Sequence, residues 1–105
     1  MARPFNHPAV RDISIDNVLH ALSDPMRREI IRKLMAGESM SCVGACSTLP
    51  PSTISFHHKI LREAGLIRSE KKGVEVINTL RRHDIDMRFP GLLDAIFHNT
   101  TPPLT

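Results

Sequence analysis

The sequence predicts a mainly helical α+β fold within a single domain, and three patterns support this prediction. Two helical segments are separated by a short break that contains two prolines. Two segments of alternating polarity, joined by a basic turn with a glycine, follow directly. Short helices with large apolar stripes are expected near both ends of the chain, so helices outweigh strands.

Length and composition limit the chain to one modest domain. It has 105 residues, 41% of them hydrophobic, and because it has only four Phe and no Trp or Tyr, aliphatic side chains must fill the core. No apolar run approaches the ~18 residues of a membrane span, and residues 1–12 are too polar for a signal peptide. We therefore expect a cytoplasmic protein with no membrane partner, whose two cysteines stay reduced.

Basic residues are concentrated in the middle of the chain. The whole chain has a net charge of +3, but residues 25–82 carry 11 basic and 5 acidic residues, a net charge of +6, whereas the remainder carries 3 and 6, a net charge of −3. This asymmetry fits a central surface that meets a polyanion and terminal segments that pair with another subunit. A solvated charged face is the alternative interpretation of the charge alone.

Two helices are predicted before residue 38. Apolar residues recur at i, i+3, i+4 and i+7 from Ile15 to Leu22, which marks one face of a short helix. Asp24 is a good N-cap and Pro25 suits the first position of a second helix, which is expected to end at Gly37. Most of the cations of this second helix are expected to lie on a solvated face, with contact of one of them to a DNA phosphate as the alternative: Arg27, Arg28, Arg32 and Lys33.

Two further helices form the helix-turn-helix. Ser41 is expected to cap a third helix that reaches about Thr48, and Leu49-Pro50-Pro51 then breaks the chain. A fourth helix is predicted from Ser52 to Ala64, and Gly65 supplies its left-handed stop. His58 lies on the apolar stripe of this helix, where we expect it to be half-buried with a hydrogen-bond partner.

A β-hairpin follows at once. Strands are predicted over Leu66–Lys71 and Val74–Leu80, with Lys71-Lys72-Gly73 as the turn. A helix-turn-helix followed by such a two-stranded hairpin is a winged helix, in which the cations of the wing reach the phosphate backbone beside the groove that the helix enters.

The terminal helices are the predicted dimer interface. A last helix is expected to have Pro90 near its first position, and its stripe is large for so short an element. Together with the first helix it suits an isologous contact. The predicted interface residues are Ile15, Val18, Leu19, Leu22, Phe89, Leu92, Leu93, Ile96 and Phe97. Residues 1–11 and 99–105 are predicted to be loose tails.

Two stretches of this chain resemble the ArsR family of bacterial winged-helix repressors. One is Val18–Ile31, with Leu22-Ser23-Asp24-Pro25 and then Arg27, and the other is Ser52–Ile67. The resemblance covers about residues 15–98. It implies a homodimer that binds double-stranded operator DNA of two-fold character and releases it when a metal ion, metalloid, oxidant or other signal arrives.

The resemblance also implies which residues contact DNA. Neither Arg nor Asn stands in the first turns of the recognition helix for a bidentate base contact, so short side chains, His57 or DNA shape would read the sequence. For His57, capping or packing within the motif is the alternative to base contact. The predicted DNA-binding residues are Ser52, Thr53, Ser55, Phe56, His57, Lys59, Arg68, Lys71 and Lys72.

The sequence defines the effector that would release DNA less well than it defines the DNA-binding residues. Family members that sense metalloids often carry Cys-x-Cys before the turn, whereas this chain has Cys42 and Cys46, which lie at i, i+4 on a helix. Two thiolates on one helix face could bind a soft metal ion if another part of the protein supplied a third ligand. Alternatively, the two cysteines could be small core residues. Asp94 and His98 also lie at i, i+4, but the spacing of the family's second metal site is missing, so we assign no metal to these residues. No cofactor is required.

Three other classes of function compete with a repressor. An enzyme is not expected, because the chain has no Gly-rich phosphate loop and no nucleophile with an orienting base. A winged helix that binds protein alone would lack the cations found at Lys59, Arg68, Lys71 and Lys72. A regulator that responds to an organic ligand, or to no direct effector, remains an alternative.

Overall fold

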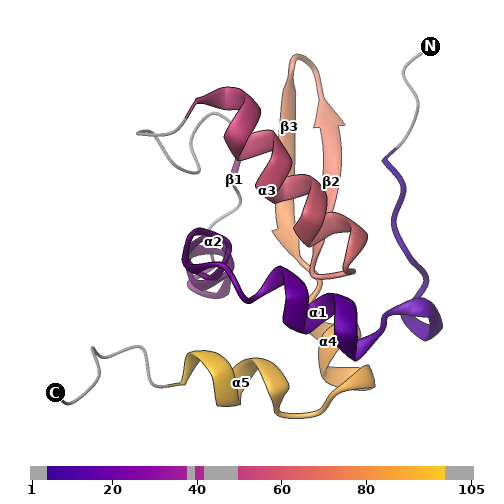
Figure 1. Cartoon of the computed structure of the whole chain (residues 1–105). Helices are drawn as coiled ribbons and strands as arrows, with labels where there is room; N and C mark the ends of the chain where they lie inside the picture. The colour runs from indigo at the N-terminus through magenta and orange to yellow at the C-terminus, as the bar shows by residue number, and fades with distance from the viewer. Residues whose placement is uncertain (1–4, 38–39, 42–49, 99–105) are drawn as a thin grey trace, which may run out of the picture.

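The computed structural model describes residues 5–37, 40–41 and 50–98 (Figure 1). It confirms the predicted second helix of the helix-turn-helix and the hairpin that follows it, whereas most of the first helix predicted for that motif lies outside the described residues. The elements are a short 3-10 helix η1 (Val10–Asp12), α1 (Ile15–Ala21), α2 (Pro25–Met35), β1 (Met40–Ser41), α3 (Pro51–Glu63), β2 (Ile67–Lys72), β3 (Glu75–Leu80), α4 (Arg82–Arg88) and α5 (Leu92–Phe97).

The recognition helix α3 lies across the β2–β3 hairpin, whose tip projects beyond the helices. Helices α1 and α5 lie at the opposite end of the molecule (Figure 1). Aliphatic residues from α1, α2, α3, the start of β2, α4 and α5 form one buried cluster, which contains Val18, Ile31, Leu61, Ile85 and Leu93. None of the helices in the described ranges is long and apolar enough to cross a membrane.

Side-chain caps define where the first two helices begin. The Ser14 hydroxyl accepts the N–H of Asn17 at the start of α1, a cap that the sequence patterns did not predict. As predicted, Asp24 caps α2: its carboxylate accepts the N–H groups of Met26 and Arg27 at 2.8 and 3.2 Å, and Pro25 occupies the first position. Although burial opposes it, these N–H groups lower the pKa of Asp24.

The end of α3 confirms the predicted glycine stop. Gly65 has φ +89°, its N–H donates to the carbonyl of Arg62, and the N–H of Leu66 donates to the carbonyl of Leu61, both at 3.0 Å. This pair of bonds is a Schellman motif, which satisfies the last carbonyls of the helix and turns the chain directly into β2. The relative placement of α3 and the hairpin is therefore set by the three residues between them, Ala64, Gly65 and Leu66.

The sheet has one strand more than predicted. β2 pairs with β3 in antiparallel register from Ile67↔Leu80 to Lys72↔Glu75, so the turn residues are Gly73 and Val74, one position later than predicted. The short β1 adds to the other side of β3, giving the order β1-β3-β2. Ser41, expected to cap a helix, instead pairs with Ile77. The rest of that predicted helix lies outside the described residues, with Cys42 and Cys46, as does the predicted tail 99–105.

The C-terminal region contains two helices where one was predicted. Helix α4 follows β3 directly, and α5 begins at Leu92 after Gly91, which has φ +81°. Pro90 therefore lies between the helices and not at the first position of the last one, because the left-handed Gly91 separates it from α5.

We predict that Gly65→Ala destabilises the fold by about 2–4 kcal/mol, because a non-glycine residue is strained at this φ and the new Cβ would lie 2.6 Å from Cγ1 of the buried Ile13. Gly91→Ala is the matched control, since it has a similar φ but nothing within 4 Å of a new Cβ, and it should cost about 1–2 kcal/mol. Urea denaturation measures both; equal losses would show that the Ile13 contact is unimportant.

Candidate nucleic-acid interface

One face of α3 is exposed and polar except for a single aromatic ring. Ser52, Ser55 and Lys59 are exposed, Thr53 is half-buried, and Phe56 is 56% exposed. The opposite face is buried and consists of residues at i, i+3, i+4 and i+7: Ile54, His57, His58 and Leu61. The exposed face can therefore present hydroxyls, an ammonium and a phenyl ring to a partner.

The hairpin carries cations beside this face. Arg68, Lys71 and Lys72 are exposed on β2, and Val74 at the turn is 99% exposed. The first turn of α3 and the tip of the hairpin lie at the same end of the molecule (Figure 1). Cations and hydroxyls arranged in this way suit phosphate contacts on both sides of a groove.

His57 is a packing residue in this structure. It is only 9% exposed, and its Nδ1 lies 3.2 Å from Nη1 of Arg27. Because a guanidinium is always a donor, this Nδ1 accepts the hydrogen bond. The sequence left two interpretations of His57 open, base contact and packing within the motif. Its burial and its bond to Arg27 support packing within the motif.

Arg27 joins three helices, so the expectation of a solvated face for it was wrong. The side chain is 6% exposed; its Nε donates to the carbonyl of Ala21 at 2.6 Å and Nη2 lies 3.4 Å from the carbonyl of His20. Arg28 likewise donates to the carbonyl of Leu22 at 2.8 Å. The two guanidinium groups thus satisfy the open carbonyls at the C-terminal end of α1, where cations also suit the helix dipole.

The spacing of the sequence contains a signal for the burial of Arg27. Arg27, Ile30, Ile31 and Leu34 are the buried residues of α2 and follow the pattern i, i+3, i+4, i+7. Arg32, by contrast, is exposed and pairs with Glu29 on the outer face, as expected of a solvated cation.

Arg62 connects the recognition helix to the wing. Its Nη1 lies 3.1 Å from the hydroxyl of Ser69, which donates in turn to Oδ1 of Asn78 at 2.5 Å. Ser69 and Asn78 face each other across β2 and β3 and are buried. Arg62 also stacks over the ring of Phe5, 4.5 Å from its centroid. This polar chain holds the base of the wing against the last turns of α3.

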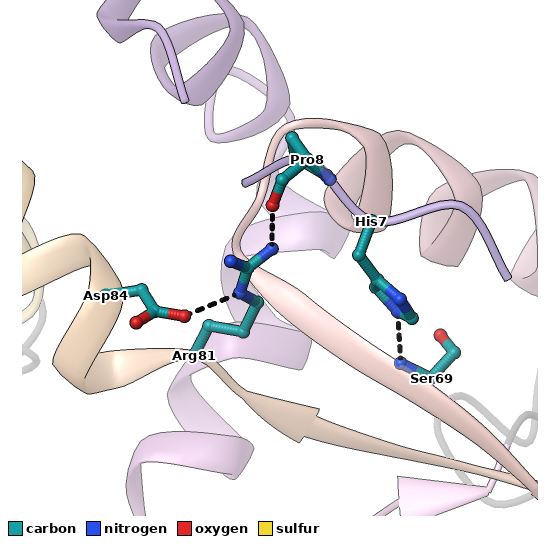
Figure 2. A network of polar contacts seen from close by, with 5 residues as sticks. All are labelled: His7, Pro8, Ser69, Arg81 and Asp84. Carbon is teal, nitrogen blue, oxygen red and sulfur yellow. Dashed lines mark hydrogen bonds and ion pairs between the residues drawn. The ribbon is translucent and has the colours of Figure 1, made fainter. Parts of the chain in front are cut away.

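Residues 5–8, predicted to belong to a loose tail, are bound along β2. Figure 2 shows the N–H of Ser69 donating to Nε2 of His7 at 2.9 Å, and Arg81 donating to the carbonyl of Pro8 at 2.8 Å and to Asp84 at 2.9 Å. Burial and the nearby guanidinium groups lower the pKa of His7, which favours the neutral ring that can accept a hydrogen bond. We call residues 5–8 the N-terminal strap.

His58 is fully buried, at 1% exposure, and within the described part of the chain neither ring nitrogen has a hydrogen-bond partner. The predicted partner is therefore missing there. Burial, together with the charges of Arg62 and His57, lowers the pKa of His58 to about 4, so the ring is neutral near pH 7.

The predicted dimer residues divide into three groups by their burial. Val18, Leu22, Leu93 and Phe97 belong to the core of this chain, because the short terminal helices must close that core, and they are not free for a partner. Phe89, Leu92 and Ile96 are partly buried beside it. Ile15 and Leu19 are 38% and 50% exposed at i, i+4 on α1.

The described residues also contain one small hollow that could hold a ligand. A hollow of about 200 Å³ between α1 and α3 is lined by Asn17, His20, Ile60, Glu63 and Ala64, none of which was predicted to bind anything. Within residues 5–37 and 50–98 no three His, Cys, Asp or Glu side chains gather as metal ligands. Asp94, which lies at i, i+4 from His98, binds Arg82 at 2.5 Å.

Comparisons with known proteins agree with this geometry. A family described as a helix-turn-helix domain matches residues 22–70. The HTH-type transcriptional regulator YceK of Bacillus subtilis is 37% identical over 82 residues, covering 75% of this chain and 82% of YceK. The HTH-type transcriptional repressor SmtB of Mycobacterium tuberculosis is 33% identical over 99 residues, covering 90% of this chain and 70% of SmtB.

Solved structures give the same fold. The ArsR family transcriptional regulator RHA00566 superposes with a TM-score of 0.63 over 83% of this chain and 93% of that one, at 18% identity. These relatives are HTH-type transcriptional regulators, and the chain, with its fold and exposed basic face, belongs to the same class of winged helix-turn-helix regulators. The chain belongs to the ArsR/SmtB family of such regulators.

The neutral, unpaired ring of His58 predicts an acid-sensitive fold. Unfolded His58 takes up a proton near pH 6.5, whereas the folded ring stays neutral down to about pH 4. The unfolded state binds more protons in this window, so stability should fall by about 3 kcal/mol as the pH drops from 6.5 to 4.

His58→Leu should abolish that part of the fall and raise stability at pH 7.5 by about 1–3 kcal/mol, because it removes two unpaired buried nitrogens. Urea denaturation over pH 4–8 measures both effects, with His83→Leu at an exposed position as control. Parallel pH profiles for wild type and His58→Leu would contradict this assignment.

Proposed function

We propose that the protein represses transcription in the cytoplasm as a homodimer bound to an operator of two-fold character. The observation that supports DNA binding is the exposed face of α3, with Ser52, Ser55 and Lys59 beside the exposed cations of β2. In this proposal α3 enters the major groove, and Lys71 and Lys72 contact phosphates next to it.

The exposed face of α3 also determines which side chains can read the DNA sequence. His57 is held by Arg27, so base contacts fall to Ser52, Thr53, Ser55 and Phe56, with Lys59 and Arg68 on phosphates. Small hydroxyls read bases weakly, and DNA shape therefore contributes to operator choice.

Replacing both Lys71 and Lys72 by Ala should weaken binding to all duplexes to a similar extent, because phosphate contacts carry no sequence information. The slope of log K against log salt should fall by about 0.9 for each phosphate that the variant no longer neutralises. Fluorescence anisotropy at several salt concentrations measures this.

Arg11→Ala serves as the control, since Arg11 is exposed on η1 away from α3 and the hairpin (Figure 1). Salt-independent binding by the wild type, or no binding to the DNA upstream of its own gene, would contradict the proposal.

The homodimer is supported by the unpartnered apolar residues of α1. Ile15 and Leu19 are exposed one helical turn apart, and the partly buried Leu92 and Ile96 have the same spacing on α5. Both helices lie at the end of the molecule opposite the hairpin tip (Figure 1). A two-fold contact there leaves both recognition helices facing DNA.

Leu19→Glu should convert the dimer to a monomer, because a carboxylate would be buried without a partner in the interface. Operator affinity should fall at least about tenfold, since each subunit then binds alone. Size-exclusion chromatography with light scattering gives the mass. Met87→Glu, at another exposed apolar position, is the control and should remain dimeric. A dimeric Leu19→Glu protein would contradict this interface.

We further propose that an effector, where one acts through thiols, is a soft metal ion, a metalloid or an oxidant at Cys42 and Cys46. This proposal rests on their i, i+4 spacing. Cys42→Ser and Cys46→Ser should then each bind the operator normally but fail to release it on addition of arsenite, Zn²⁺ or peroxide. Normal release by both variants would show that the thiols are packing residues.

A further inference from the structure

Phe56 is the residue on α3 whose position the fold alone does not explain. Its ring is 56% exposed on a face otherwise formed by Ser52, Ser55 and Lys59. A Phe ring at this position keeps apolar area in water, which a polar residue at the same surface position would avoid. An exposed ring in the centre of the proposed DNA face therefore points to a contact made in the complex.

The Phe56 side chain has a packing partner on α3 before DNA binds. Phe56 packs against His57 with ring centroids 5.9 Å apart and planes tilted by 55°. His57 is fixed by Arg27, which also binds the C-terminal carbonyls of α1. The direction in which Phe56 leaves the helix is thus set by buried contacts, and little ordering remains for the moment of binding.

The chemistry of the groove identifies the group that the ring would meet. Among the base edges of the major groove, the C5-methyl of thymine is the apolar feature, whereas the others are hydrogen-bond donors and acceptors that suit Ser52 and Ser55. The ring lies among the first two turns of the helix, and recognition helices contact base edges with these N-terminal turns.

We propose that Phe56 is a specificity-determining residue that reads the C5-methyl of a thymine in each operator half-site. This inference rests on the proposed operator binding by α3. It assigns sequence discrimination to an apolar contact on a helix that carries no Arg or Asn in its first turns.

The test removes the methyl group without changing base pairing. Wild-type protein first selects a duplex from a random pool, and each thymine of the selected site is then replaced by deoxyuridine. Affinity is measured by anisotropy at fixed salt. At one position in each half-site, deoxyuridine should weaken wild-type binding about fourfold, the effect of one buried methyl group.

The Phe56→Ala variant should bind the thymine and deoxyuridine duplexes at that position with equal affinity. Lys59→Ala is the matched control: it should bind every duplex more weakly but keep the fourfold difference. Phe56 is exposed, so its replacement should leave the thermal midpoint nearly unchanged; if Phe56→Ala did not fold, Phe56→Ser would take its place.

The outcomes separate this inference from the function it depends on. If wild type binds with steep salt dependence but no thymine position is sensitive to deoxyuridine, or if Phe56→Ala keeps the full difference, the inference is wrong and DNA binding stands. If no duplex is bound in a salt-dependent manner, the proposed function itself is wrong.

Discussion

The side chain of Arg27 holds together the elements on which the rest of the molecule is arranged. It leaves α2, binds the last carbonyls of α1 and reaches His57 on α3. A buried guanidinium is costly unless its donors are satisfied, and here the open end of a helix supplies the acceptors. Arg27 donates to the carbonyl of Ala21, whereas the carbonyl of His20 also accepts from Ser23. The cation and the helix end therefore stabilise each other, and this one group links the first three helices.

The polar contacts around α3 divide the helix into an anchored side and a free side. Arg27 holds its middle through His57, and Arg62 ties its last turns to Ser69 at the base of the wing. The Schellman turn at Gly65 leaves only three residues between helix and strand. With α3 and the hairpin fixed to each other, the DNA binding proposed above requires little rearrangement within one subunit.

Local signals in the sequence were enough for much of the fold. Asp24 with Pro25 and the glycine at 65 each act over a few residues, so the start of α2 and the end of α3 were predictable. The buried side of α3 was also encoded at i, i+3, i+4 and i+7: His58 was placed on it from the sequence, whereas His57, which also lies there, was assigned to the DNA-facing residues. Contacts between distant segments gave no such signal: β1 is two residues long, and His7 meets Ser69 62 positions away. Likewise, Pro90 favoured a helix start that the left-handed Gly91 prevented.

The N-terminal strap covers part of the outer edge of the sheet. β2 is the outer strand on its side, and an outer strand offers unpaired amides on which a strand from another molecule can grow. His7 occupies the amide of Ser69 with an imidazole, a group that cannot extend a β-ladder, and Pro8 next to it has no N–H to offer. The N-terminal strap thereby covers part of the outer edge of the hairpin and opposes edge-to-edge self-association there.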